Sequence, residues 1–228
     1  MNIVLTHQPS REMNKIIAIE GLIGAGKTTL HTKLSGYLDE TAGIPAVGLA
    51  EKVDLEELKI YLSDIPRNSF DFQLSMLRKR LTLTEEAVKL KEKGYTVIMD
   101  RSLIGDRAFT IMLHEKGYIS DEQMIELQQV TDEFSQKYLR SLQGKPADLV
   151  IFLRCDLDVC MKRIERRSIL SEVDAYDEKY LSSLQNAYVK SMEGHGITYV
   201  EWNEPKLSLS TDGLLDPKEI KGILDCIL

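Results

Sequence analysis

Nine consecutive residues near the amino terminus have the types and spacing of a phosphate-binding loop. Residues 21–29 read GLIGAGKTT, which fits GxxxxGK[ST], and they follow the apolar run Ile16–Ile19. A strand, a glycine-rich loop and a helix in this order form a cradle for nucleoside triphosphates. Glycines allow left-handed backbone dihedrals, which turn N–H groups inward around a phosphate, and the N-terminus of the following helix adds its dipole.

We therefore expect the loop to bind ATP together with Mg²⁺. Lys27 would reach the β- and γ-phosphates, and the Thr28 hydroxyl would bind the Mg²⁺ that bridges them. The alternative is a glycine turn that binds nothing, but the strand, the spacing and the Lys-Thr pair argue against it. The residues expected to contact the nucleotide are Gly21, Gly24, Ala25, Gly26, Lys27, Thr28 and Thr29.

Two apolar runs further along the chain end in charged residues. Phosphoryl transfer needs a group that orients or deprotonates the nucleophile, and cations that stabilise the transition state. Because ligands bind at the carboxyl ends of strands in open α/β sheets, Glu51 is the candidate base, Asp100 a candidate Mg²⁺ ligand and Arg101 a candidate phosphate clamp. The structural alternatives are that Glu51 is a solvated loop acid and that Asp100 or Ser102 caps a helix.

A predicted long helix carries Gln73 and Arg80, seven residues apart. Two helical turns place them on nearly the same side. A side-chain amide can bond bidentately to a nucleobase edge, and an arginine steadied by an acid such as Asp106 can read an adjacent acceptor. As isolated polar residues they would more often be solvated.

Three arginines, Arg163, Arg166 and Arg167, end another predicted helix. They lie where a lid over the nucleotide is expected, at about residues 163–175, and closure of such a lid would exclude water and neutralise the leaving phosphate. Basic residues in a last helical turn also complement the helix dipole, which is the alternative.

Alternating strands and helices must position these residues. This alternation predicts an α/β fold with a mostly parallel sheet covered on both faces. A break is expected at Ile65-Pro66, and Ser120 with Gln123 is expected to form a capping box. Strands are expected at 16–19, 44–50, 95–99, 149–153 and 197–200, and helices at 28–40, 54–62, 68–92, 103–116, 121–142, 156–167, 176–192 and 217–227.

Composition narrows the class of protein. The chain has 228 residues, which we expect to form a single domain, 1–228, with residues 1–14 as a flexible arm. The net charge of −7 argues against a nucleic-acid binder, and no apolar run approaches the ~20 residues of a membrane span. Its three cysteines, Cys155, Cys160 and Cys226, have no metal-binding spacing, so we expect reduced thiols and a cytoplasmic protein.

Taken together, these features resemble the deoxynucleoside kinase family, which includes deoxycytidine, deoxyguanosine and deoxyadenosine kinases, over residues 15–201. In that family a catalytic Glu follows the second strand, here Glu51. A helix carries Phe-x-Phe-Gln, matched at 70–73, with a base-reading Arg seven residues later, here Arg80. A Glu/Asp-Arg-Ser motif matches 100–102, and Asp106 takes the place of a family Asp.

The resemblance implies further contacts and a P-loop kinase fold with five parallel strands and an Arg-bearing lid. Arg163 and Arg167 match the lid, while Tyr61 and Glu172 match contacts to the sugar 3′-hydroxyl. Met76, one turn after Gln73, would touch the base. The implied substrate set is Glu51, Tyr61, Phe72, Gln73, Met76, Arg80, Arg101, Asp106 and Glu172.

Two departures from the family pattern concern the sugar and the metal. Residues 51–55 read Glu-Lys-Val-Asp-Leu, whereas the family usually has Glu-Pro followed by an aromatic residue, so the sugar pocket is expected to differ. The second motif begins with Asp100 rather than Glu, as in the bacterial purine-preferring branch. An Arg kept together with an Asp, here Arg80 and Asp106, resembles the members that use cytosine and purine bases.

The resemblance thus implies an ATP-dependent kinase of nucleotide salvage that phosphorylates a 2′-deoxynucleoside, with deoxycytidine or a purine deoxynucleoside preferred. It also implies a homodimer, for which the helices at 103–142 are candidates. A nucleoside monophosphate kinase, such as thymidylate kinase, is the first alternative, although residues 51–80 offer few cations beyond Lys52, Lys59, Arg67 and Arg78 to Arg80. The second is a non-catalytic module that uses the loop as a switch.

Overall fold

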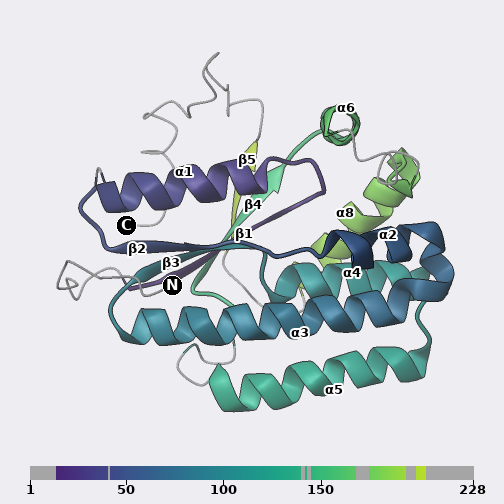
Figure 1. Cartoon of the computed structure of the whole chain (residues 1–228), viewed down its shortest axis with the longest axis horizontal. Coiled ribbons are helices and arrows are strands. Elements are labelled where there is room, and N and C mark those ends of the chain that lie inside the picture. Colours follow the sequence, from purple (N-terminus) through teal and green to yellow (C-terminus); the bar gives the residue numbers. More distant parts are fainter. Residues whose placement is uncertain are drawn as a thin grey trace.

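A parallel β-sheet forms the centre of the computed structural model, which describes residues 14–40, 42–139, 142, 145–167, 175–193 and 199–203 (Figure 1). The strand order is β2-β3-β1-β4-β5, and every neighbouring pair is parallel. The α/β architecture expected from the sequence is therefore confirmed. The strands are β1 Ile16–Gly21, β2 Ala46–Leu49, β3 Thr96–Asp100, β4 Leu149–Arg154 and β5 Tyr199–Asn203.

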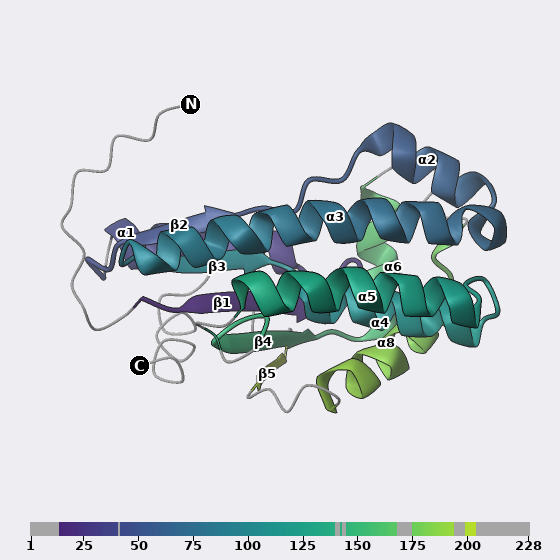
Figure 2. The same ribbon diagram turned by 90° about the horizontal axis from the view of Figure 1, so that it is seen from below.

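Helices cover both faces of this sheet (Figures 1 and 2). The helix α1 lies on one face, α3 and α4 lie on the other, and α5 packs on α3 and α4. The remaining helices α2, α6 and α8 gather at the end toward which the strands run (Figure 1). The helices are α1 Lys27–Glu40, α2 Leu55–Ser63, α3 Ile65–Glu92, α4 Leu103–Glu115, α5 Asp121–Tyr138, α6 Leu157–Arg166 and α8 Glu178–Glu193.

The central strands are apolar because helices cover them on both sides. Every residue of β1 and β3 is buried. Two of these buried residues are acids, Glu20 and Asp100, and both stand at the carboxyl end of their strand. Since a buried charge is costly unless it is paired, these two positions mark the edge of the sheet where polar interactions gather.

The long helix α3 begins earlier than expected. It starts at Ile65, so the break between α2 and α3 falls at Asp64, one residue before the expected Ile65-Pro66, and Pro66 lies in the first turn. The first N–H groups of a helix have no intrahelical partner, so proline loses nothing there. The carboxylate of Asp64 caps the helix by accepting a hydrogen bond from the Arg67 backbone N–H at 3.2 Å.

Other element bounds differ by a few residues. The capping box at the start of α5 is confirmed, with reciprocal bonds between Ser120 and Gln123 of 2.9 and 3.3 Å. That helix ends at Tyr138 rather than at residue 142. The edge strands differ too: β2 is shorter than 44–50, because only residues 46–49 pair with β3, and β5 covers 199–203 rather than 197–200.

The register of the strands brings the predicted chemistry to one edge. Ile19 of β1 pairs with Asp100, the last residue of β3, and Gly21 pairs with Leu153 of β4. Glu51 follows β2 by two residues. The phosphate-binding loop and both predicted acids therefore lie at the carboxyl edge of the sheet, as expected for ligands in this class of fold.

Several expected features lie outside the described residues. They are the arm up to residue 13, the lid from 168 to 174 with Glu172, and the closing helix at 217–227 with Cys226. The other two cysteines, Cys155 and Cys160, are buried thiols. Within the described parts of the chain, no helix is both long and apolar enough to cross a membrane.

Candidate active site

The glycine-rich loop connects β1 to α1 and has the backbone that its sequence predicts. Gly21, Gly24 and Gly26 have φ angles of +145°, +82° and +98°, a region that other residues rarely adopt. A Cβ atom on Gly24 would lie only 2.6 Å from the carbonyl oxygen of Cys160, so a side chain there would force the backbone apart. The loop thus keeps its N–H groups close to any phosphate that it binds.

Three of the expected nucleotide contacts, Gly24, Lys27 and Thr28, line one cavity. The Lys27 Nζ donates to the Leu22 carbonyl oxygen at 2.7 Å, so this side chain folds back over the loop. Burial, together with the charge of Arg101, lowers the pKa of Lys27 to about 7. The other four expected contacts in this loop, Gly21, Ala25, Gly26 and Thr29, lie outside the cavity lining; Ala25 is buried and Thr29 is exposed on α1.

The Thr28 hydroxyl donates to Oδ2 of Asp100 at 2.7 Å. The other carboxylate oxygen of Asp100, Oδ1, is buried and has no hydrogen-bond partner. A hydroxyl beside a carboxylate with an unsatisfied oxygen suits Mg²⁺, which binds oxygen ligands and is typically held by one or two protein groups plus phosphates. These two side chains therefore fit the predicted metal site.

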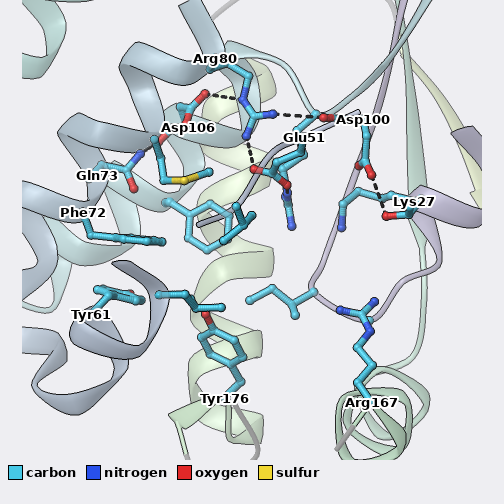
Figure 3. A pocket seen from close by; sticks show the side chains of 18 residues that line it. Lys27, Glu51, Tyr61, Phe72, Gln73, Arg80, Asp100, Asp106, Arg167 and Tyr176 are labelled. Atoms are coloured by element: carbon cyan, nitrogen blue, oxygen red, sulfur yellow. Dashed lines mark hydrogen bonds and ion pairs between the residues drawn. The ribbon is translucent and has the colours of Figure 1, made fainter. Parts of the chain in front are cut away.

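Glu51 contacts two guanidinium groups, that of Arg80, which is labelled in Figure 3, and that of Arg101. Its Oε1 accepts a hydrogen bond from Nη2 of Arg80, and its Oε2 lies 3.3 Å from Nε of Arg101. Burial would raise the pKa of Glu51, but the charges of Arg80 and Arg101 outweigh it and hold the pKa below its ordinary value. This carboxylate is therefore ionised at neutral pH and able to accept a proton or a hydrogen bond.

Arg80 also reaches across to α4, as the two-turn spacing and the acid partner had suggested. Its Nε donates to Oδ2 of Asp106 at 2.9 Å, and its Nη1 donates to the carbonyl oxygen of Asp100 at 3.1 Å. The Gln73 Nε2 donates to the carbonyl oxygen of Asp106 at 3.1 Å. Burial raises the pKa of Asp106, with the Arg80 charge opposing it. One guanidinium thus contacts both Glu51 and Asp106.

Aromatic rings form the wall opposite these charges. Tyr61 and Phe72 stack with ring centroids 4.4 Å apart and an interplanar angle of 11°. The Tyr61 hydroxyl lies 3.0 Å from the Tyr180 hydroxyl, and burial raises the pKa of Tyr61 to about 12. Met76 also lines this wall. The part of the cavity lined by these aromatic rings, here called the aromatic slot, fits a planar heterocycle beside the polar side chains.

Of the three arginines predicted for a lid, Arg166 is exposed, and Arg163 and Arg167 behave differently from each other. Arg163 lies against the phosphate-binding loop, where its Nη1 donates to the carbonyl oxygens of Gly24 and Ala25, each at 3.3 Å. Arg167 is exposed and lines the cavity (Figure 3). Within the described part of the lid, Arg163 therefore supports the loop, and Arg167 reaches the ligand space.

Sequence reasoning missed several residues of the site. Five further lining residues are Ile23, Val53, Leu58, Phe109 and Tyr176. Val53 stands in the segment that departs from the family pattern, and Asp54 beside it caps α2 by accepting from the Glu56 and Glu57 N–H groups. Sequence reasoning also missed Tyr188 and Glu20. The only sequence signal for Glu20 is that it is an acid within the apolar strand β1.

Comparisons with known proteins show which family the chain matches. The family model of deoxynucleoside kinases matches residues 17–223. A deoxyadenosine kinase of Dictyostelium discoideum is 28% identical over 208 residues, which are 91% of this chain and 77% of that protein. The deoxyadenosine/deoxycytidine kinase of Bacillus subtilis is 27% identical over 217 residues, which are 94% of this chain and 92% of that protein.

A solved structure supports the fold. The deoxyadenosine kinase from M. mycoides with bound dATP superposes with a TM-score of 0.66 at 22% sequence identity. The superposition covers 93% of this chain and 98% of that one.

The low pKa of Lys27 predicts how the stability of the ligand-free protein changes with pH. Because this pKa is about 7 in the folded chain and 10.5 ordinarily, the unfolded chain binds more protons between these values. The contribution of Lys27 to the free energy of unfolding therefore rises with pH across this window.

Urea unfolding of the wild type and Lys27→Met at about pH 7, 8 and 9 measures this contribution as the difference between the two proteins, which cancels the other titrating groups. We expect the difference, wild type minus variant, to increase with pH. A difference that stays constant would show that Lys27 keeps an ordinary pKa.

Proposed function

The chain belongs to the deoxynucleoside kinase family, and we propose that it transfers the γ-phosphoryl group of ATP to the 5′-hydroxyl of a 2′-deoxynucleoside. The products are ADP and the deoxynucleoside 5′-monophosphate. The observation that carries this proposal is the position of Glu51, which lies between the phosphate-binding loop and the aromatic slot, in contact with Arg80 and Arg101.

The donor half of the site would bind the triphosphate through the loop and the start of α1. Lys27 would turn from the Leu22 carbonyl toward the β- and γ-phosphates. Thr28 and Asp100 would hold Mg²⁺, which neutralises charge on the phosphates when bound. From the other side, Arg167 would approach the transferring group as the lid closes.

The acceptor half would bind the nucleoside in the aromatic slot. Gln73 has a side-chain oxygen and N–H groups directed along one wall, and Arg80, steadied by Asp106, supplies N–H donors beside it. This pattern supports a base that presents both an acceptor and an amino group, as cytosine and adenine do. Tyr61 and Glu172 would contact the sugar 3′-hydroxyl, the role that the family resemblance implies.

The chemical step would depend on position and charge. Glu51, held ionised by the two arginines, would accept a hydrogen bond from the 5′-hydroxyl and orient or deprotonate it for in-line attack. Arg101 would stabilise negative charge on the transferring phosphoryl group. An acceptor that already carries a 5′-phosphate would need further cations near Glu51.

Such cations are not part of the cavity lining among the described residues. The basic residues that line it are Lys27, Arg80, Arg101 and Arg167, and two of these already bind carboxylates. Lys59 pairs with Glu56 instead, at 2.6 Å. This favours a nucleoside over a nucleoside monophosphate as acceptor, and the proposal is for a kinase of nucleotide salvage.

The proposal includes a single domain and a homodimer that pairs through α4 and α5. The buried thiols Cys155 and Cys160 support a reducing compartment, such as the cytoplasm.

A substrate panel tests the proposed reaction. Purified protein with Mg-ATP should phosphorylate deoxynucleosides, with kcat/KM highest for deoxycytidine or a purine deoxynucleoside. Lys27→Ala should abolish turnover, and Glu51→Gln should lower kcat by about 10²–10⁴-fold, as expected for loss of a catalytic acid–base group.

Assays with the corresponding monophosphates as acceptors distinguish the alternatives. Faster transfer to a monophosphate than to its nucleoside would identify a nucleoside monophosphate kinase. Tight ATP binding without transfer to either acceptor, unaffected by Glu51→Gln, would identify a non-catalytic nucleotide-binding module.

The base-reading pair makes a second prediction. Replacing Arg80 and Asp106 together by leucine should raise the ratio of kcat/KM for thymidine to that for deoxycytidine by about tenfold or more, because the site no longer pairs with an amino-bearing base. Absolute rates should fall for every nucleoside, since Glu51 loses one of its two arginines. Arg78→Leu, an exposed position on the same helix, is the control and should keep the wild-type ranking. An unchanged ranking in the double variant would contradict the base-pocket assignment.

A further inference from the structure

The backbone of Arg101 is in an unusual conformation. Its φ of +68° makes it the one non-glycine residue with a positive φ among the described residues. A strained backbone of this kind persists only where the surroundings hold it, and it is common at functional sites. The contacts that hold Arg101 therefore bear on how the proposed reaction works.

The guanidinium of Arg101 is held from several sides. Its Nε faces Glu51 at 3.3 Å, and its Nη1 donates both to the Gly21 carbonyl oxygen at 3.2 Å and to the Tyr188 hydroxyl. The ring of Phe109 lies beneath it, with 5.2 Å from Cζ to the ring centroid. Of these neighbours, Tyr188 belongs to none of the motifs that identify the family.

Tyr188 comes from α8 and has no exposed surface. Its hydroxyl accepts from Arg101, which can only donate, and donates in turn to Oε2 of Glu20 at 3.0 Å. The order of donors and acceptors in this chain is thus fixed from Arg101 through Tyr188 to Glu20. A hydroxyl with its lone pair and its proton both engaged has little freedom to rotate.

Glu20 anchors the other end of this chain. It is fully buried, and its Oε1 accepts from the Ser102 N–H at 2.7 Å, the Ser102 hydroxyl at 2.8 Å and the Gly105 N–H at 3.2 Å. A Cβ on Gly105 would lie 2.8 Å from Oε2 of Glu20, so the approach is close. This one carboxylate joins the residue before the phosphate-binding loop to the start of α4, directly after Arg101.

We propose that Tyr188 and Glu20 are positioning residues that hold the Arg101 guanidinium against Glu51 and the reacting phosphate. The inference rests on the proposed function and adds α8 to the elements that build the site. Tyr188 fixes the direction of the guanidinium, and Glu20 fixes Tyr188 together with the backbone on the far side of Arg101. The strained backbone of Arg101 makes such support necessary, because without it the residue can relax away from Glu51.

The test is Tyr188→Phe, which removes one hydroxyl and keeps the ring against Phe152. With the deoxynucleoside that the wild type uses best, we expect kcat to fall about tenfold, since misplacement of a catalytic group by ~1 Å can cost about 10²-fold. KM for the nucleoside should change less than twofold, because Tyr188 does not line the cavity. A higher KM for the nucleoside together with an unchanged kcat would overturn the proposal.

Ser191→Ala is the matched control. Ser191 lies on the same helix, is equally buried, and donates to the Ile104 carbonyl oxygen of α4 at 2.9 Å. Ser191→Ala should lower the melting temperature about as much as Tyr188→Phe does, while its kcat stays within twofold of the wild-type value. An equal loss of kcat in both variants would show that Tyr188 acts only through α8 packing.

A double-mutant cycle with Arg101→Ala separates positioning from folding. If Tyr188 acts through Arg101, Tyr188→Phe should cost nothing further in the Arg101→Ala background, measured with radiolabelled ATP. An additive tenfold loss there would overturn the inference.

Glu20→Gln provides a second variant if Tyr188→Phe fails to fold. The three donors around Oε1 hold the amide oxygen at that position, which leaves the amide nitrogen facing Tyr188, from which it cannot accept. We therefore expect a similar loss of kcat, and wild-type kcat would contradict the proposal. An active wild type with unaffected variants overturns this inference alone. A wild type that phosphorylates no deoxynucleoside overturns the proposed function and this inference with it.

Discussion

The pairing of one partly buried carboxylate with two buried guanidiniums organises this molecule. Glu51, Arg80 and Arg101 come from a loop after β2, from α3 and from the end of β3, and none of them is stable alone in a poorly solvated interior. Removing one partner of a buried ion pair leaves an uncompensated charge, which typically costs about 3–5 kcal/mol. The fold must therefore bring these three elements together, and the carboxyl edge of a parallel sheet is where strands and loops can do so.

The same cluster connects the two halves of the proposed site. Arg80 binds both Asp106 and Glu51, so the proposed base-binding group and the proposed catalytic carboxylate share one side chain. Arg101 binds Glu51 and the carbonyl oxygen of Gly21, so the carboxylate is also coupled to the phosphate-binding loop. In the proposed reaction, a nucleoside that binds Arg80 would change the charges around Glu51, which would link substrate choice to the chemical step.

Much of this arrangement follows from local sequence rules. Glycines with a following Lys-Thr predict the loop, the position after a strand predicts Glu51, and a spacing of two turns predicts that Gln73 and Arg80 share a face. The contacts that complete the site join residues far apart in sequence, so no local pattern reports them. Tyr188 meets Arg101 across 87 residues and Glu20 across 168. The start of α3 is a similar case. Pro66 could end the preceding helix or begin the next one, and the cap that Asp64 forms on α3 decides for the second.

The ionisation of Glu51 is the most direct measure of the central pairing. A carbon-13 carboxylate titration of the ligand-free protein, with the Glu51 signal assigned by its absence in Glu51→Gln, gives its pKa. We expect a midpoint below the ordinary 4.5 in the wild type and a higher midpoint in Arg101→Leu, where only one of the two arginines still opposes the effect of burial. A wild-type midpoint at or above 4.5, or one that does not change in Arg101→Leu, would contradict the account.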